Sequence, residues 1–126
     1  KEGMATALTP TTFWVLTALA GGRRHGYDIL TEVAEASEGA VELKVPTLYA
    51  ALERMERDGL VARDGDDVIN GRARRYFRLT DDGRTRLTAE VESLEKSAAV
   101  ARLRMAAPVR ATPKLAFSGM LQGAPA

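Results

Sequence analysis

The chain has 126 residues, of which 45% are apolar and 28% are charged, and this composition suits one small soluble domain. The absence of cysteine excludes disulfides, thiol catalysis and thiolate metal sites, and the one histidine, His25, cannot build a zinc site alone. Because no apolar run reaches ~18 residues and no signal peptide is recognisable, we expect a cytoplasmic protein that uses no cofactor and no metal and meets no membrane.

The net charge of +1 hides a segregation of charged residues along the chain. Between His25 and Leu43 every charged side chain is acidic, whereas between Gly71 and Leu79 every charged side chain is basic. A local basic segment of this kind is the electrostatic footprint expected of a surface that binds nucleic acid.

The N-terminal part of the chain predicts a short segment, residues 1–8, followed by an apolar helix. Met4 is the expected natural start, with residues 1–3 an added remnant. Thr9 followed by Pro10 predicts a helix start, because threonine caps the first turn and proline needs no acceptor there, and a pair of glycines ends the helix. Its apolar residues surround the axis, so we expect burial on two sides, the second against another subunit.

A second helix is predicted over residues 26–37, with His25 as a polar residue at its start. Residues 41–45 form a short extended segment with room for a small strand. The second helix is amphipathic: its apolar face carries Ile29, Leu30, Val33 and Ala34, and its solvent face carries Asp28, Glu32 and Glu35.

A third helix is predicted to begin at Pro46 and to stop at Gly59. Val45 holds the capping position and has no hydrogen-bonding side chain, so the first N–H groups are free for another acceptor such as a DNA phosphate. On a helical wheel the inward stripe is Leu48, Ala51, Leu52 and Met55, and the outward face is Ala50, Glu53, Arg54 and Arg57, flanked by Thr47 and Tyr49.

Two strands are predicted next, over residues 60–64 and 74–79. Turn-forming residues at 65–67 and 70–71 indicate an antiparallel hairpin with a longish, mobile tip. Alternation places Arg75 with Phe77 and Leu79 on one face of the second strand and Tyr76 with Arg78 on the other. The aspartates of the hairpin, Asp64, Asp66 and Asp67, are expected either to face away from any bound DNA or to shorten the nonspecific residence of the protein on DNA.

A long helix follows, capped by Thr80 and with acids in its first turn, and Pro108 ends it. Apolar residues recur along it at alternating spacings of four and three, which predicts a short coiled-coil seam. The seam consists of Leu87, Val91, Leu94, Ala98, Ala101 and Met105.

The element order predicts a mainly α fold with a small β-hairpin wing (α+β). In domain terms this is a winged helix-turn-helix over residues 9–80, a C-terminal dimerisation helix over 81–107 and a proline-containing tail over 108–126. No Ser-His-Asp set and no phosphate-cradling glycine motif is identifiable, so we do not expect an enzyme.

Three segments also carry a family resemblance, in correct order and spacing over about residues 8–105. They are His25-Gly26-Tyr27-Asp28-Ile29, then residues 46–61 (Pro-Thr-Leu-Tyr-Ala-Ala-Leu-Glu-Arg-Met-Glu-Arg-Asp-Gly-Leu-Val), then residues 74–83 (Arg-Arg-Tyr-Phe-Arg-Leu-Thr-Asp-Asp-Gly). Together they resemble the PadR family of bacterial transcriptional regulators.

The resemblance implies a homodimer that represses transcription from an inverted-repeat operator in double-stranded DNA and releases it when a small-molecule effector binds. It implies that the first and last helices make the dimer contact, and that the start of the third helix and the basic wing meet DNA. The family often has a longer side chain at position 50, which is Ala here. The long helix contains no aromatic residue, so Phe13 and Trp14 are the candidate effector contacts, and they are also candidate dimer contacts.

The candidate DNA-binding residues are Lys44, Thr47, Tyr49, Ala50, Arg54, Arg57, Arg72, Arg74 and Arg75. Tyr27 and Tyr49 are each expected to be structural in part, burying a ring and presenting a hydroxyl. One competing hypothesis is a winged-helix adaptor, whose third helix meets a partner protein instead of DNA. A metal-sensing regulator of similar fold is a third option, which the absence of cysteine and the single histidine weaken.

Overall fold

The computed structural model describes residues 6–108, so the remnant and start proposed at residues 1–4, and the tail beyond Pro108, lie outside the described residues. Among the described residues, 6–92 belong to one compact unit and 93–108 belong to a second. The described elements, in chain order, are α1 (Pro10–Ala20), β1 (Arg24–His25), α2 (Gly26–Ala36), α3 (Val45–Arg57), β2 (Val61–Ile69), β3 (Arg72–Leu79) and α4 (Asp81–Ala106).

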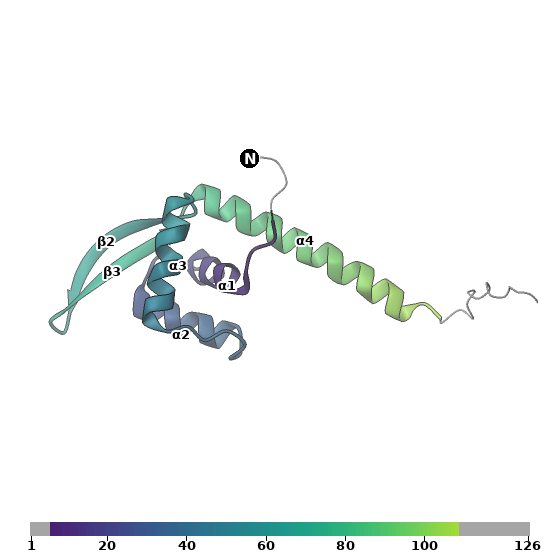
Figure 1. Cartoon of the computed structure of the whole chain (residues 1–126), viewed down its shortest axis with the longest axis horizontal. Coiled ribbons are helices and arrows are strands. Elements are labelled where there is room, and N and C mark those ends of the chain that lie inside the picture. Colours follow the sequence, from purple (N-terminus) through teal and green to yellow (C-terminus); the bar gives the residue numbers. More distant parts are fainter. Residues whose placement is uncertain (1–5, 109–126) are drawn as a thin grey trace, which may run out of the picture. The chain divides into compact units, whose positions relative to one another are not determined.

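The core of the first unit lies where α1, α2 and α3 meet the base of the β2–β3 hairpin (Figure 1). The stripe predicted for the third helix is confirmed, since all four of its residues are at least 98% buried. Phe13 and Trp14 are only half-buried, and their rings meet edge to face at 5.2 Å. The core comprises Val15, Leu16, Ala18, Leu19, Ile29, Val33, Leu48, Ala51, Leu52, Met55, Val61, Phe77 and Leu87.

The first two helices begin as predicted. The Thr9 side chain caps α1 by accepting a hydrogen bond from the Thr12 N–H at 3.2 Å. His25 caps α2 in the same way, with its Nδ1 accepting from the Asp28 N–H at 3.2 Å. These caps satisfy N–H groups that the first turn of a helix cannot pair internally.

The helical pattern placed the acidic face of α2 in solvent, but in the structure an arginine covers part of this face. The Arg24 guanidinium lies 3.2 Å from the Asp28 carboxylate and 3.8 Å from that of Glu32. Its Nε also donates to the Ala18 carbonyl at 2.8 Å, near the end of α1. Arg24 thus joins α1 to α2 and partly covers two of the three acids.

The start of α3 differs slightly from the prediction. The helix begins at Val45, so Lys44 holds the capping position instead of Val45. As expected, no side-chain hydrogen bond caps this end. The segment over 41–45, which had room for a small strand, contains none, because residues 41–44 are irregular and Val45 is already helical.

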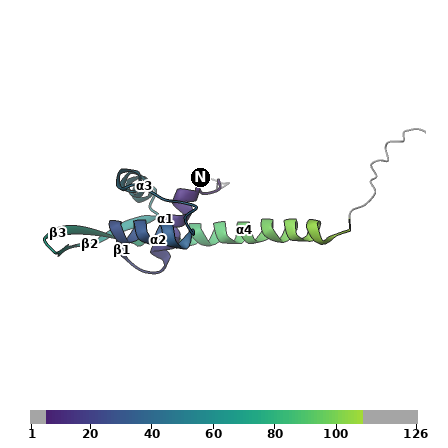
Figure 2. The ribbon, with the colours of Figure 1, turned by 90° about the horizontal axis from the view of Figure 1, so that it is seen from below.

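The sheet has three strands, in the order β1-β3-β2 and all antiparallel, where the sequence predicted two. The additional strand pairs Arg24 with Phe77 and His25 with Tyr76. The wing, residues 61–79, is longer and more regular than predicted, and both views show it extending beyond the short helices (Figures 1 and 2).

The tip of the wing is shorter than predicted. Asn70 and Gly71, with φ of 53° and 76°, form a two-residue turn of the kind that matches the twist of paired strands. Further down, Asp64 and Gly65 together oppose Tyr76, so β2 contains a bulge there, with Gly65 at φ 92°. The glycine-aspartate run read as a turn is therefore a bulge followed by more strand.

The long helix α4 starts as predicted, with the Thr80 hydroxyl accepting a hydrogen bond from the Gly83 N–H at 2.9 Å. The same hydroxyl donates to the Gly59 carbonyl at 2.6 Å, which links the end of the wing to the end of α3. Gly83 has no room for a Cβ, which would collide with the Leu60 carbonyl. Along the predicted seam Leu87 is buried, whereas Leu94 and Met105 are 50% and 78% exposed.

Candidate nucleic-acid interface

The outward face of α3 is arranged as the wheel predicted. Thr47, Ala50, Arg54 and Arg57 are all exposed, on the side opposite the buried stripe. Both arginines lie in the last turn, where a cation also complements the helix dipole. An exposed helical face anchored by a buried one is the arrangement that lets a helix enter the major groove.

The N-terminus of α3 has unpaired polar groups beside an exposed cation. Lys44 is exposed and caps the helix only through its carbonyl, which accepts from the Leu48 N–H at 2.9 Å. Because no side chain caps this end, the first-turn N–H groups and the Lys44 ammonium present positive charge together.

Tyr49 links three elements. Its ring centroid lies 6.4 Å from that of Phe77, and the side chain is 37% exposed. Its hydroxyl lies against Gly26, where an added Cβ would come within 2.8 Å of the ring carbon Cζ. A side chain at position 26 would therefore displace the Tyr49 ring, which packs from α3 against the start of α2 and against β3. The mixed role predicted for Tyr49 fits this position.

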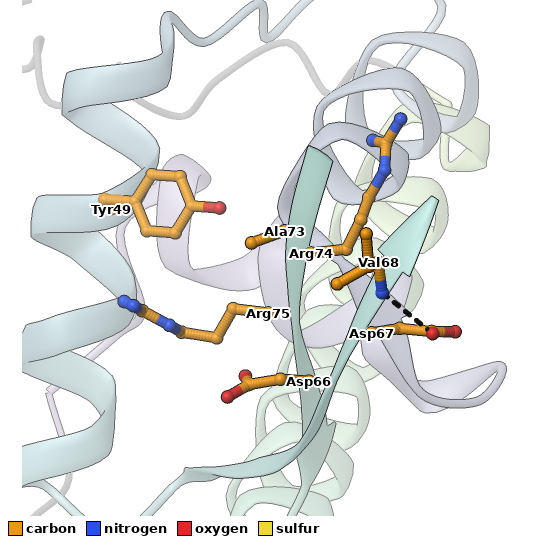
Figure 3. Close-up of a pocket in the computed structure, with 7 residues that line it drawn as sticks. All are labelled: Tyr49, Asp66, Asp67, Val68, Ala73, Arg74 and Arg75. Carbon is orange, nitrogen blue, oxygen red and sulfur yellow. Dashed lines mark hydrogen bonds between the residues drawn. The ribbon is translucent and has the colours of Figure 1, made fainter. Parts of the chain in front are cut away.

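The two adjacent wing arginines point to opposite faces of β3. Figure 3 shows Arg75 extending toward α3, on the same side as Tyr49 and Asp66, whereas Arg74 extends from the other side of the strand. Arg75 is exposed, and Arg74 is half-buried with its guanidinium carbon 6.0 Å from the centre of the Tyr27 ring. The Nε of Arg74 is buried without a hydrogen-bond partner, so only its terminal nitrogens can reach a ligand freely.

Several hollows lie beside the exposed face of α3, and two of them are on opposite sides of it. One, of about 500 Å³, lies between Tyr49 and the wing and is also lined by Asp66, Val68 and Arg75 (Figure 3). The other, of about 520 Å³, is lined by Thr47 and Arg54 together with residues at the start of α1. The outward face of α3 is therefore a ridge between two depressions.

The wing aspartates do not lie on a side of the hairpin separate from the arginines. In the strand register Asp66 lies opposite Arg75, and Asp67 lies opposite Arg74. Directly opposite residues in antiparallel strands share a face of the sheet, so each face of the wing carries an aspartate beside an arginine.

Arg23 and Tyr27 also belong to this region, although neither was among the predicted DNA-binding residues. The Arg23 guanidinium donates to the Asp64 carbonyl at 3.0 Å and lies 3.8 Å from the centre of the Tyr76 ring. It thereby fastens the bulge of β2 to the segment between α1 and α2. Tyr27 is 67% exposed beside Arg74, which contradicts the expectation that it buries its ring.

Within residues 6–108, no group of three or more histidine, cysteine, aspartate or glutamate side chains is placed to hold a metal ion. None of the helices in that range is both long enough and apolar enough to cross a membrane.

Comparison with known proteins identifies the family. The sequence pattern of the transcriptional regulator PadR-like family matches residues 15–89, which span α1 to the first turns of α4. The chain belongs to this family. The predicted PadR family and the predicted winged-helix fold are both confirmed.

Individual relatives agree with this membership. Over 64 residues the chain is 41% identical to the transcriptional regulator Rv3488 of Mycobacterium tuberculosis, which covers 51% of the chain and 59% of that protein. The chain spans about three fifths of the length of the curated relatives it matches.

Solved structures share the fold. A PadR family transcription regulator from Clostridium difficile is 26% identical, with a TM-score of 0.65 over 77% of this chain and 99% of that one. The structure of Bacillus subtilis PadR in complex with operator DNA is 21% identical, with a TM-score of 0.56 over 64% of this chain and 46% of that one.

Proposed function

We propose that this regulator binds double-stranded DNA through α3 and the wing. The observation that carries the proposal is the convergence of both elements on one surface, where Arg75 of the wing faces Tyr49 at the edge of the exposed face of α3. Further support comes from family membership and from the fold shared with a PadR protein whose structure contains operator DNA.

In the proposed complex α3 lies in the major groove. The ridge formed by Thr47, Ala50, Arg54 and Arg57 reaches the base edges, and the two hollows beside it leave room for the phosphate backbones of the groove. Ala50 can contact only apolar groups such as the thymine methyl, so the two arginines supply the hydrogen bonds to bases.

The wing and the start of α3 supply binding that is independent of sequence. Lys44, Arg72 and Arg75 are exposed cations that can pair with phosphates, and each such contact releases counterions. Arg74 contributes through its terminal nitrogens while its stem packs beside Tyr27.

The proposed assembly is a homodimer joined through the seam of α4, together with Phe13 and Trp14. The apolar stripe of α4 favours contact with a partner helix, because in a monomer this stripe is exposed to water. Its exposed residues are Val91, Leu94 and Met105. Two α3 helices in such a dimer read half-sites about one helical turn (~34 Å) apart, which makes the operator an inverted repeat.

We further propose that the regulator is a cytoplasmic repressor and that a small-molecule effector relieves repression. Phe13 and Trp14 are the proposed effector contacts, since their half-buried rings lie on α1, one of the helices proposed to form the dimer.

The direct test is a gel shift with the DNA upstream of the protein's own coding region. We expect tight binding to one inverted repeat, weakened by about 10³-fold or more as salt rises from about 0.05 to 0.2 M, because several phosphate contacts are made. Absence of binding at low salt would contradict the proposal and favour the adaptor, in which the outward face of α3 meets a protein.

A further inference from the structure

The tip of the wing, residues 66–75, contains two aspartates, although carboxylates repel the phosphates that this surface is proposed to bind. Three arginines at positions 72, 74 and 75 stand against Asp66 and Asp67, so the tip keeps one net positive charge. The strands are paired throughout this tip, so the acids are held among the arginines and not in a separate loop.

The register fixes which groups are neighbours. Asp66 lies opposite Arg75 and Asp67 opposite Arg74, a relation that places the Cβ atoms of each pair about 5 Å apart. Figure 3 shows Asp66 and Arg75 on the same side of the wing, toward α3. No ion pair joins either aspartate to either arginine in the structure, so the carboxylates stand beside the arginines without neutralising them.

Neither acid has a structural role that needs its negative charge. Both side chains are exposed. The Asp67 carboxylate accepts a hydrogen bond from the Val68 N–H at 2.8 Å, and an asparagine amide oxygen could accept the same bond. Asp64 differs, because its carboxylate lies 3.6 Å from Arg23 and its carbonyl is part of the bulge.

We propose that Asp66 and Asp67 restrain the affinity of the wing for DNA phosphates, and this rests on the DNA-binding function proposed above. A phosphate that reaches Arg74 or Arg75 comes close to a carboxylate of like charge, and the repulsion weakens contacts that carry no sequence information. Weak sequence-independent binding leaves more of the regulator free to find its operator among the competing sites of a genome.

The test is the paired variant Asp66→Asn/Asp67→Asn, measured by fluorescence anisotropy with a random-sequence duplex. We expect about tenfold tighter binding at about 0.05 M salt, and a smaller gain at about 0.2 M, because salt screens repulsion between exposed charges. Unchanged or weaker binding by the folded variant would overturn the proposal.

Two further variants separate local repulsion from net charge and from packing. Glu35→Gln/Glu92→Gln removes the same charge from exposed positions outside α3 and the wing, and we expect a much smaller gain. An equal gain would overturn the local role of the tip acids. Asp66→Glu/Asp67→Glu keeps the charges, so it should bind as the unmodified protein does, and a tenfold gain here would also overturn the proposal.

Failure of this proposal and failure of the proposed function give different results. If the unmodified protein binds neither the random duplex nor its own upstream DNA at low salt, the DNA-binding function and the restraint fall together. If it binds both and the asparagine variant binds no tighter, only the restraint is wrong.

Discussion

The two parts of the proposed DNA surface are held in place by different forces. The position of α3 is set by packing, because its inner stripe is almost completely buried against α1, α2 and the base of the wing. Most residues at the tip of the wing are exposed, and the bulge below the tip is fastened by polar and stacking contacts from Arg23. We infer that α3 is held rigidly and contacts the bases, whereas the wing is held less firmly and its affinity for DNA depends mainly on charge.

The largest expected effect comes from breaking the packing under α3. Leu52 is 1% exposed, so Leu52→Ala should lower the free energy of unfolding by about 2–5 kcal/mol. Urea denaturation measures this change. Arg57→Ala, on the exposed side of the same helix, should change it by less than about 0.5 kcal/mol, and equal losses would contradict the inward and outward faces assigned here.

The next effect concerns the seam of α4, which in the proposed dimer sets the distance between the two α3 helices. Leu94→Glu places a charge in the proposed dimer contact, so we expect light scattering to report a monomer and operator affinity to fall about a hundredfold. Leu103→Glu is the matched control, because Leu103 is 71% exposed and lies off the seam. A dimer that survives Leu94→Glu would show that the seam is not the contact.

A smaller effect is expected from loosening the wing without touching its tip. Arg23→Ala removes the hydrogen bonds to the Asp64 carbonyl and the stacking on Tyr76. Affinity for any duplex should fall about two- to tenfold, the cost of about one hydrogen bond, and amide exchange in β2 should speed up. Arg84→Ala is the control, because it removes an exposed arginine of α4 that makes no such contact. An equal loss of affinity in this control would show that Arg23 acts only through its charge.

The helices could be predicted from the sequence because their rules are local. A threonine before a proline, glycines at helix ends and a periodic apolar stripe placed α1, α2 and α3 to within a residue or two of their observed ends. The family resemblance rested on the same segments, and the family match confirms it.

The sheet was harder to predict because its form depends on distant partners. Arg24 and His25 become a strand only because Phe77 and Tyr76 lie beside them. The bulge at Gly65 shifts the alternation, so that Arg63 and Asp66 face the same way, and no local rule distinguished it from a turn. Consequently the neighbours of the wing aspartates, the position of Arg74 and the contribution of Arg23 emerged only from the structure.

The division of labour between α3 and the wing is tested most directly by two matched arginine pairs. Arg54→Ala/Arg57→Ala removes two exposed cations from α3, and Arg72→Ala/Arg75→Ala removes two from the wing, leaving half-buried Arg74 intact. Both are measured against the operator and a random duplex over a range of salt. We predict that the wing variant loses affinity equally for both duplexes, with a salt slope shallower by up to about two, whereas the α3 variant loses mainly operator affinity. Equal behaviour of the two variants would contradict the division, and unchanged affinity in both would contradict DNA binding through this surface.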